Sequence, residues 1–250
     1  MSAPVYHELG HGITCVDTAY IRPALAACYL LVENAQAAFI DTGTNYTVPS
    51  LLELLAIKGV AREDVVYVMP THVHLDHGGG AGELMRQLPN AELVIHPRGA
   101  RHMIDPAKLT AGATAVYGEK EFRKSFGELV PVPESRVIVA DDGFELDFNG
   151  RRLSFLDTPG HARHHYCVYD ETSEGFFTGD TFGISYRELD GADGAFIIPT
   201  TPPTQFDPQA WCQSLDRLMS YEPRRMYLTH FGMVTGVPRL ADDLRRGIGE

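Results

Sequence analysis

The sequence predicts an α+β fold in a single domain that spans residues 1–250. Short runs of β-branched and aromatic residues recur along the chain, and residues 65–69 form the clearest of these predicted strands. Segments with apolar residues at helical spacing lie between them, as at 208–221. The chain has 250 residues, 44% hydrophobic and 22% charged, so it can bury the substantial core of a globular protein.

The first part of the chain is expected to begin with strands and turns and then to alternate strands with helices. Polar residues 33–36 separate two apolar runs, which favours a hairpin, and Gly59 follows a leucine-rich segment as a helix stop. In order, we expect strands across 5–41 that include 29–32 and 37–40, a helix at 50–58, a strand at 65–69, a helix at 81–88 and a strand at 93–95.

Residues 97–133 differ from their surroundings, because they have helical character without a clear strand. We interpret them as a helical insertion within the domain. Two roles remain open for it. It is either a surface insertion with a partly buried aromatic face, or a lid over a binding site to which Tyr117 and Phe122 contribute.

The second half predicts strands, one long irregular segment and two helices. The dipeptide Asn149-Gly150 favours a tight turn between two strands. Residues 183–207 are rich in Gly, Pro, Thr and Asp and lack a regular pattern, and a loop of this length usually has a function. The expected elements are strands at 137–139, 144–148, 152–156, 166–169, 175–177 and 225–229, with helices at 208–221 and 239–246.

Composition limits the partners of the protein. The formal net charge of −12 argues against a nucleic-acid groove, which would be basic, and against electrostatic docking to an anionic membrane. The four cysteines form no Cys-x-x-Cys pair, and Cys28 and Cys167 are expected to be buried and reduced. We find no signal-peptide pattern and no apolar run of membrane-spanning length, so we expect a cytoplasmic protein with a small-molecule substrate. The sequence leaves a homodimer open.

The residues with the most distinctive chemistry are concentrated at 71–80, which reads Thr-His-Val-His-Leu-Asp-His-Gly-Gly-Gly. His72, His74, Asp76 and His77 follow a predicted strand, and imidazole with carboxylate suits zinc, iron or manganese. In an extended loop the first three would alternate in phase, with the fourth one step out, so one metal is not expected to take all four. Two metals could share them, the first two residues serving one metal and the last two the other. The three glycines permit close backbone approaches.

Three later strands also run into a ligand-type residue. The residues that they lead to are His161, Asp180 and His230, the first of them through 157–160. A loop at the end of one strand cannot enclose a metal alone, so we expect the remaining ligands to come from these positions.

These motifs resemble those of the metallo-β-lactamase-fold hydrolases. The matching stretches are Asp-Thr-Gly at 41–43, Thr-His-x-His-x-Asp-His-Gly-Gly at 71–79, Thr-Pro-Gly-His at 158–161, Gly-Asp at 179–180 and Thr-His at 229–230. The resemblance implies a four-layer αββα sandwich, whereas the sequence pattern alone gives only α+β. It also implies two metal ions and their ligands: His72, His74 and His161 on the first, Asp76, His77 and His230 on the second, and Asp180 bridging both.

The implied chemistry is hydrolysis. Two divalent cations ~3.5–4 Å apart lower the pKa of a shared water, so that a metal-bridging hydroxide forms near neutral pH. This hydroxide would attack a small ester, thioester or lactone, with Asp76 as the catalytic residue that orients it. Zinc is the first choice of metal, and iron or manganese also suit the ligands. Asp41 and His165 are expected to orient ligands without binding metal, and His164 is interpreted as a surface or core histidine.

Two other functions remain open. Residues 177–183, with the helical insertion, look similar to oxygen-binding di-iron relatives of flavodiiron proteins, although those usually carry a glutamate where this chain has His74. A di-iron oxidoreductase is therefore the first alternative, and a non-catalytic metal-binding sensor is the second.

The substrate pocket is expected over the metals, in the segment 181–206 that directly follows Asp180. In this interpretation Phe182 and Tyr186 cover an apolar acyl group, and Arg187 pairs with a carboxylate. The alternative is that the aromatic rings pack inward and Arg187 meets a neighbouring acid.

Overall fold

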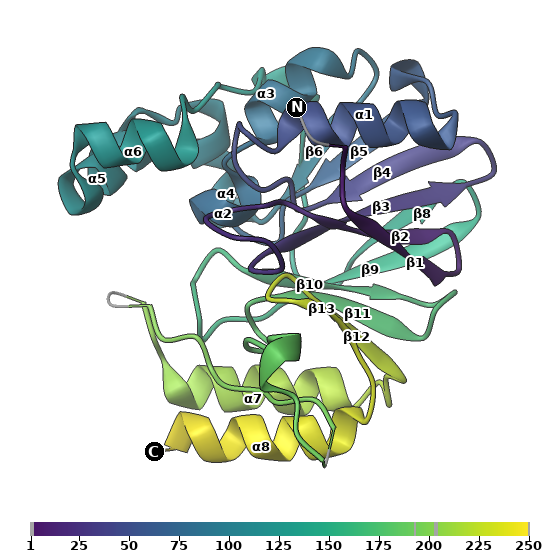
Figure 1. Ribbon diagram of the computed structural model, residues 1–250, viewed down its shortest axis with the longest axis vertical. Helices are drawn as coiled ribbons and strands as arrows, with labels where there is room; N and C mark the ends of the chain where they lie inside the picture. The colour runs from purple at the N-terminus through teal and green to yellow at the C-terminus, as the bar shows by residue number, and fades with distance from the viewer. Residues whose placement is uncertain (1–2, 193, 203–204, 250) are drawn as a thin grey trace. The chain divides into compact units, whose positions relative to one another are not determined.

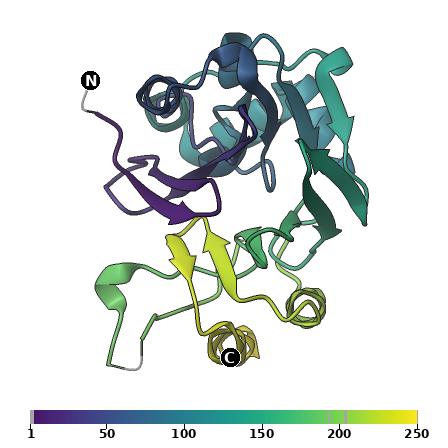
Figure 2. The same ribbon diagram turned by 90° about the vertical axis from the view of Figure 1, so that its right-hand side faces the viewer.

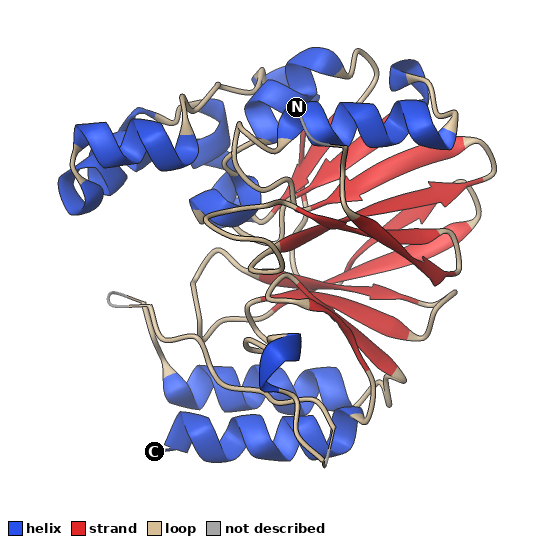
Figure 3. Ribbon diagram, in the orientation of Figure 1, coloured by secondary structure: helices blue, strands red, loops and turns tan. Residues whose placement is uncertain are grey.

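The computed structural model describes residues 3–192, 194–202 and 205–249. The chain divides into two compact units, residues 1–140 and 141–250. Each unit consists of one β-sheet and its helices, which Figure 1 labels and Figure 3 colours by type.

The first unit contains a seven-stranded sheet in the order β1-β2-β3-β4-β5-β6-β7. Neighbouring strands pair antiparallel from β1 to β4 and parallel from β4 to β7. The strands are β1 (Tyr6–Gly10), β2 (Ile13–Asp17), β3 (Ala27–Glu33), β4 (Gln36–Ile40), β5 (Val65–Met69), β6 (Glu92–Ile95) and β7 (Val137–Val139).

Helices of the first unit pack on this sheet through one apolar core. Leucines of the first helix, Leu51 and Leu54, are fully buried there with Phe39 and Val68 of the sheet. Figure 1 shows the pair α5 and α6 projecting from the rest of the unit. The helices are α1 (Val48–Lys58), α2 (Leu75–Gly78), α3 (Ala81–Gln87), α4 (Pro97–Ile104), α5 (Ala107–Tyr117) and α6 (Glu119–Phe126), with short 3-10 turns at Arg62–Asp64 and Glu134–Arg136.

The second unit contains a six-stranded sheet in the order β13-β12-β11-β10-β9-β8. Only β11 and β12 pair in parallel; the other neighbours are antiparallel. The strands are β8 (Phe144–Phe148), β9 (Arg151–Asp157), β10 (Tyr166–Asp170), β11 (Gly175–Gly179), β12 (Arg225–Leu228) and β13 (Gly232–Val234).

Two long helices, α7 (Pro208–Met219) and α8 (Val237–Gly249), lie side by side along one face of this sheet (Figures 1 and 2). The carboxylate of Asp207 caps α7 by accepting from the amide of Ala210 at 3.0 Å. Trp211 of α7 is fully buried in the core between helices and sheet, and its indole N–H donates to the carbonyl of Thr181. This contact fixes the start of the irregular segment that follows β11.

Most predicted elements are confirmed, with ends that differ by at most three residues. The hairpin turn at Asn149 and the helix stop at Gly59 are confirmed, since Asn149, Gly150 and Gly59 all have positive φ. Three helices, α4 to α6, lie within the stretch 97–133. The strand β13 was not predicted, because its three residues include a glycine and only one β-branched residue.

Cys28 and Cys167 are fully buried, and all four cysteines are free. Burial raises the pKa of the Cys28 thiol well above its ordinary value and that of Cys15 to about 12. Both groups are therefore neutral packing residues at physiological pH. Among the helices in the described part of the chain, none combines the length and apolar character that crossing a bilayer requires.

One ion pair in the second unit is wholly buried. Arg151 of β9 donates through Nε and Nη2 to the carboxylate of Asp170 of β10, at 2.9 and 2.5 Å. The same carboxylate accepts from the amides of Thr172 and Ser173, so both charges have several partners. Breaking such a pair leaves an uncompensated buried charge.

We expect Asp170→Asn to lower the free energy of unfolding by about 3–5 kcal/mol, because the Arg151 charge remains buried without its counterion. Denaturant unfolding measures this change. The matched control is Glu171→Gln, which removes the exposed partner of Arg152 on the same strand pair and should change stability by less than about 0.5 kcal/mol. A loss below about 1 kcal/mol for Asp170→Asn would show that Arg151 does not depend on this carboxylate.

Candidate metal centre

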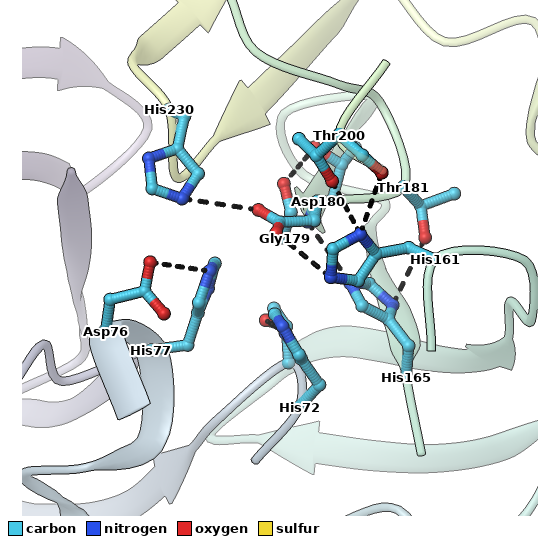
Figure 4. A network of polar contacts seen from close by, with 12 residues as sticks. His72, Asp76, His77, His161, His165, Gly179, Asp180, Thr181, Thr200 and His230 are labelled. Carbon is cyan, nitrogen blue, oxygen red and sulfur yellow. Dashed lines mark hydrogen bonds and ion pairs between the residues drawn. The ribbon is translucent and has the colours of Figure 1, made fainter. Parts of the chain in front are cut away.

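The first unit carries four ligand-type side chains directly after β5. Donor atoms of His72 and His74 lie within 4.8 Å of each other, and so do those of Asp76 and His77. The rings of His72 and His74 meet at 4.4 Å between centroids, and those of His72 and His77 at 4.1 Å. Nε2 of His77 lies 3.8 Å from Oδ2 of Asp76 (Figure 4). The predicted first-unit ligands are therefore gathered in one small region.

The extended loop expected at 71–77 is only partly correct. His74 still has extended φ and ψ angles, but Leu75–Gly78 forms the helical turn α2. The carbonyl of His74 accepts from the amides of His77 and Gly78 at 3.1 and 2.8 Å. A single turn has no periodicity to recognise, which explains why the sequence did not reveal it. His72 lies in a bend and His74 is extended, whereas Asp76 and His77 lie on the helical turn.

The glycines after the turn are required by close packing. A Cβ atom at Gly79 would lie 2.2 Å from the carbonyl oxygen of Leu75, and one at Gly80 would lie 2.6 Å from that of Thr44. Neither glycine has positive φ. The prediction of close backbone approaches is confirmed, and lack of a side chain, rather than an unusual conformation, is what these positions need.

Asp41, at the end of β4, supports two of the histidines. Its carboxylate is almost fully buried and accepts from the amide and the hydroxyl of Thr71 at 2.7 and 3.0 Å. It also contacts Nδ1 of His77 at 2.9 Å, and Thr71 Oγ1 contacts Nδ1 of His72 at 3.1 Å. Asp41 has φ of 55°, a conformation that costs energy in a residue other than glycine.

These contacts determine the tautomers of both rings. A carboxylate only accepts, so His77 donates through Nδ1. The single hydrogen of the Thr71 hydroxyl goes to Asp41, so His72 in turn donates through Nδ1 to Thr71. Each neutral ring then has its lone pair on Nε2, the form in which imidazole binds a metal.

The second unit places one carboxylate between two imidazoles. Oδ2 of Asp180 lies 3.2 Å from Nε2 of His161, and its Oδ1 lies 3.4 Å from Nε2 of His230 (Figure 4). Nδ1 of His161 donates to the carbonyl of Thr200 at 3.2 Å and contacts the Thr200 hydroxyl at 2.5 Å. Each oxygen of Asp180 therefore faces Nε2 of a different histidine.

The ring of His165 holds the backbone of Asp180 in place. The amide of Asp180 donates to Nε2 of His165 at 3.2 Å, while Nδ1 of the ring contacts the hydroxyls of Thr158 and Thr181 at 3.0 and 3.2 Å. Because Nε2 accepts, Nδ1 carries the hydrogen. Both nitrogens are thus used in positioning β11 and the residues after it. His164 is buried, consistent with a core histidine.

The donor set fits divalent metals of the first transition row. It consists of imidazoles and two carboxylates. In His72, His77 and His161 the supporting hydrogen bonds are made by Nδ1. Carbonyl, hydroxyl and carboxylate groups hold these Nδ1 atoms, as they commonly do around metal-binding histidines. The residues present therefore suit the metals that the motifs imply.

Two of the three predicted pocket residues, Phe182 and Arg187, follow the alternative interpretation. Phe182 has no exposed surface and packs in the core of α7, α8 and the sheet, so it cannot cover a substrate. Arg187 donates to the carbonyl of Ser185 and lies 3.6 Å from the carboxylate of Asp190. Tyr186 is half-buried. The Phe182 prediction is wrong, because the ring completes an apolar core, and Arg187 meets a neighbouring acid.

Two threonines were not singled out from the sequence. Thr71 links Asp41 to His72, and Thr200 holds His161. Thr71 lies inside the matched motif, and its position between the strand and the first histidine was an available signal. Thr200 lies 39 residues after His161 in an irregular segment, so nothing in the sequence connects the two.

The family model of the metallo-beta-lactamase superfamily matches residues 21–230. The chain belongs to the metallo-β-lactamase superfamily. Its fold, with two sheets and helices, is the metallo-β-lactamase fold that the motifs implied.

The metallo-beta-lactamase fold-containing protein ST1585 of Sulfurisphaera tokodaii is 27% identical over 88% of this chain and 77% of its own length. A crystal structure of ST1585 from Sulfolobus tokodaii has a TM-score of 0.71 at 26% identity, covering 89% of this chain and 80% of that chain. The acyl-coenzyme A thioesterase MBLAC2 of Homo sapiens is 25% identical over 70% of this chain and 65% of its own length. Hydroxyacylglutathione hydrolase of Crocosphaera subtropica is 27% identical over 64% of this chain and 50% of its own length. This chain thus spans less than two thirds of either named enzyme.

We expect Asp41→Asn to weaken metal affinity about 10- to 100-fold, because the carboxylate that orients His77 and Thr71 is lost. Asparagine tolerates the positive φ of this position, so the backbone should be retained. Competition with a chelator measures the affinity. Asp17→Asn is the control, since Asp17 accepts from the amides of Ala19 and Ala24 and contacts none of the histidines described above. Equal affinity in the Asp41 variant and the wild type would contradict a supporting role for this carboxylate.

Proposed function

We propose that this protein is a binuclear metal-dependent hydrolase acting on a small ester, thioester or lactone. Membership of a superfamily with hydrolases among its members supports the reaction class. The proposed ligands are His72, His74 and His161 for one metal ion, Asp76, His77 and His230 for the second, and Asp180 for both.

The observation that carries the proposal is the arrangement at Asp180. A carboxylate whose two oxygens each face a different histidine would be able to serve two metal ions. Oδ2 and Oδ1 of Asp180 face the Nε2 atoms of His161 and His230 at 3.2 and 3.4 Å. A carboxylate stabilising one protonated histidine would need only one such contact.

Two divalent cations at such a site lower the pKa of a water molecule and stabilise negative charge on a substrate oxygen. The side chains of this protein prepare the site for that chemistry. Asp41 and Thr71 hold His77 and His72 in the tautomer with Nδ1 protonated. Asp76 follows them on the helical turn, where its carboxylate can accept a hydrogen bond from the attacking water and orient it. His165 keeps the backbone of Asp180 in place.

The named relatives favour acyl substrates. One is an acyl-coenzyme A thioesterase and another a hydroxyacylglutathione hydrolase. A thioester is therefore the substrate class that we would test first, before esters and lactones.

Zinc is the proposed metal, because the proposed ligands are five imidazoles and two carboxylates. We also propose a cytoplasmic location, supported by four free cysteines, of which three are buried.

We expect two metal ions per chain in fully loaded protein, zinc being the principal one. Elemental analysis after purification without added metal, and again after reloading, measures the content. His230→Ala should reduce it to one ion per chain, since one of the three terminal ligands of the second metal is lost. One metal or fewer in loaded wild-type protein would contradict the proposal. Two iron ions with redox-dependent absorption would support the di-iron oxidoreductase instead.

We expect Asp76→Ala to lower turnover of a model thioester by about 10²–10⁴-fold while the fold is retained, because this residue orients the attacking water and lies on a turn outside the main core. Steady-state kinetics and circular dichroism measure the two effects. The control is Asp64→Ala, an exposed aspartate of the same unit. Near-normal turnover in a folded Asp76→Ala variant would remove Asp76 from the mechanism.

A further inference from the structure

The first unit contains a hydroxyl-lined pocket that the predicted substrate residues do not touch. It lies between the segment after β2, the segment after β4 and helix α6, and has a volume of about 420 Å³. This is the size of a small-molecule site. The hydroxyl groups come from Thr18, Tyr20, Thr44, Tyr46 and Ser125.

Tyr20 connects this pocket to the loop that carries the proposed ligands. Its ring packs against the apolar cluster that contains Leu75, the residue directly before Asp76. The Tyr20 ring stacks on Phe126 of α6 at 5.8 Å between centroids. Phe126, Phe122 and Leu75 of the turn α2 form one apolar cluster that Tyr20 joins. A small molecule bound in this pocket would therefore lie beside the loop of the same unit that carries the proposed metal ligands.

Both walls of the pocket are held in place. In the wall after β2, Ala19 and Ile21 have φ of 51° and 61°, which costs about 1–2 kcal/mol for each residue. The carboxylate of Asp17 stabilises this strained segment by accepting from the amide of Ala19 at 2.8 Å. In the wall after β4, the hydroxyl of Tyr46 donates to the carbonyl of Arg123 of α6 at 2.7 Å. Strain of this kind is commonly found at binding segments.

We propose that this pocket binds the thiol-carrier portion of a thioester substrate, an uncharged arm of amide and hydroxyl groups such as pantetheine, with Tyr20 and Tyr46 as specificity-determining residues. This inference rests on the proposed hydrolase function. Amides and hydroxyls of the arm pair with the hydroxyl-rich lining, and its methylene and methyl groups lie against the tyrosine rings.

The chemistry of the lining disfavours two other occupants. The hydroxyls of Tyr46 and Thr18 already donate to the carbonyls of Arg123 and Ala26. A long acyl chain would remove water from the other hydroxyl groups without offering hydrogen bonds in its place, which costs about 1–3 kcal/mol for each group left unsatisfied. A glutathione arm brings two carboxylates, and the cation in the lining, Lys124, already pairs with Glu121 at 3.1 Å. The neutral arm therefore fits this pocket better than either.

The test compares three substrates that share one acyl group: hexanoyl-pantetheine, S-hexanoyl-glutathione and S-methyl hexanethioate, which lacks a carrier. Wild-type protein should prefer the pantetheine thioester. In Tyr46→Ala the ratio of kcat/KM for hexanoyl-pantetheine to that for S-methyl hexanethioate should fall about tenfold through KM, since one ring and its hydrogen bond are lost. Tyr20→Phe should lower the same ratio by a smaller factor. Tyr221→Ala, a half-exposed tyrosine of the second unit, should leave it unchanged.

Binding without turnover gives a second readout. Calorimetry with S-methylpantetheine, a thioether that cannot be hydrolysed, should show binding to the protein as purified and about tenfold weaker binding to Tyr46→Ala. The inference is overturned if the thioesters are hydrolysed but the ratios do not depend on Tyr46 and Tyr20, or if glutathione is the preferred carrier. If S-methylpantetheine binds in a Tyr46-dependent manner but no thioester is hydrolysed, the pocket stands and the proposed function fails.

Discussion

Polar side chains are buried at the ends of several β-strands. The residues around them must provide a hydrogen-bonding or charged partner for each of these groups. His72 and His77 have no exposed surface, and Asp41 has almost none. Burying such groups is unfavourable unless each has a partner of suitable charge or hydrogen-bonding capacity. The first unit meets this requirement by placing the Asp41 carboxylate between Thr71 and His77, at the cost of a positive φ.

The second unit meets the same requirement with different residues. Asp180 follows β11 and takes its position from the ring of His165, while Thr200 holds His161. Trp211 of α7 bonds the carbonyl next to Asp180, at Thr181, and so ties the donor residues to the apolar core of the unit. In both units the supporting hydrogen bonds to the histidine rings are made at Nδ1, as in His72, His77 and His161. Nε2 lies on the other side of each ring, which is why these histidines can serve as metal ligands.

The sequence predicted the strands well because their apolar runs are bounded by glycine and polar residues, as at 65–69 and 144–148. It also identified the residues at the strand ends as ligand candidates, because imidazole and carboxylate side chains directly after buried strands are rarely needed for packing. It did not reveal the helical turn at Leu75–Gly78 or the contact between Thr200 and His161. The turn is too short to have a period, and the contact joins residues far apart in the chain.

Residues that are close in sequence to a proposed metal ligand do not always point toward it. Phe182 follows Asp180 by two residues, yet its ring turns into the core, because α7 and α8 leave an apolar space that an aromatic side chain fills. Tyr20 lies 55 positions before Leu75 and nevertheless packs against the cluster that contains it. The type of a residue tells whether it can bind a substrate, whereas the fold determines whether it lies near the loop that carries the proposed metal ligands.

We propose that donors of both units bind one pair of metal ions, with Asp180 shared between them. X-ray diffraction from crystals of zinc-loaded protein, with anomalous difference maps at the zinc edge, tests it most directly. We expect two peaks ~3.5–4 Å apart, with Asp180 bound to both ions and histidines of both units around them. A single peak, or two ions bound by residues of one unit only, would contradict it.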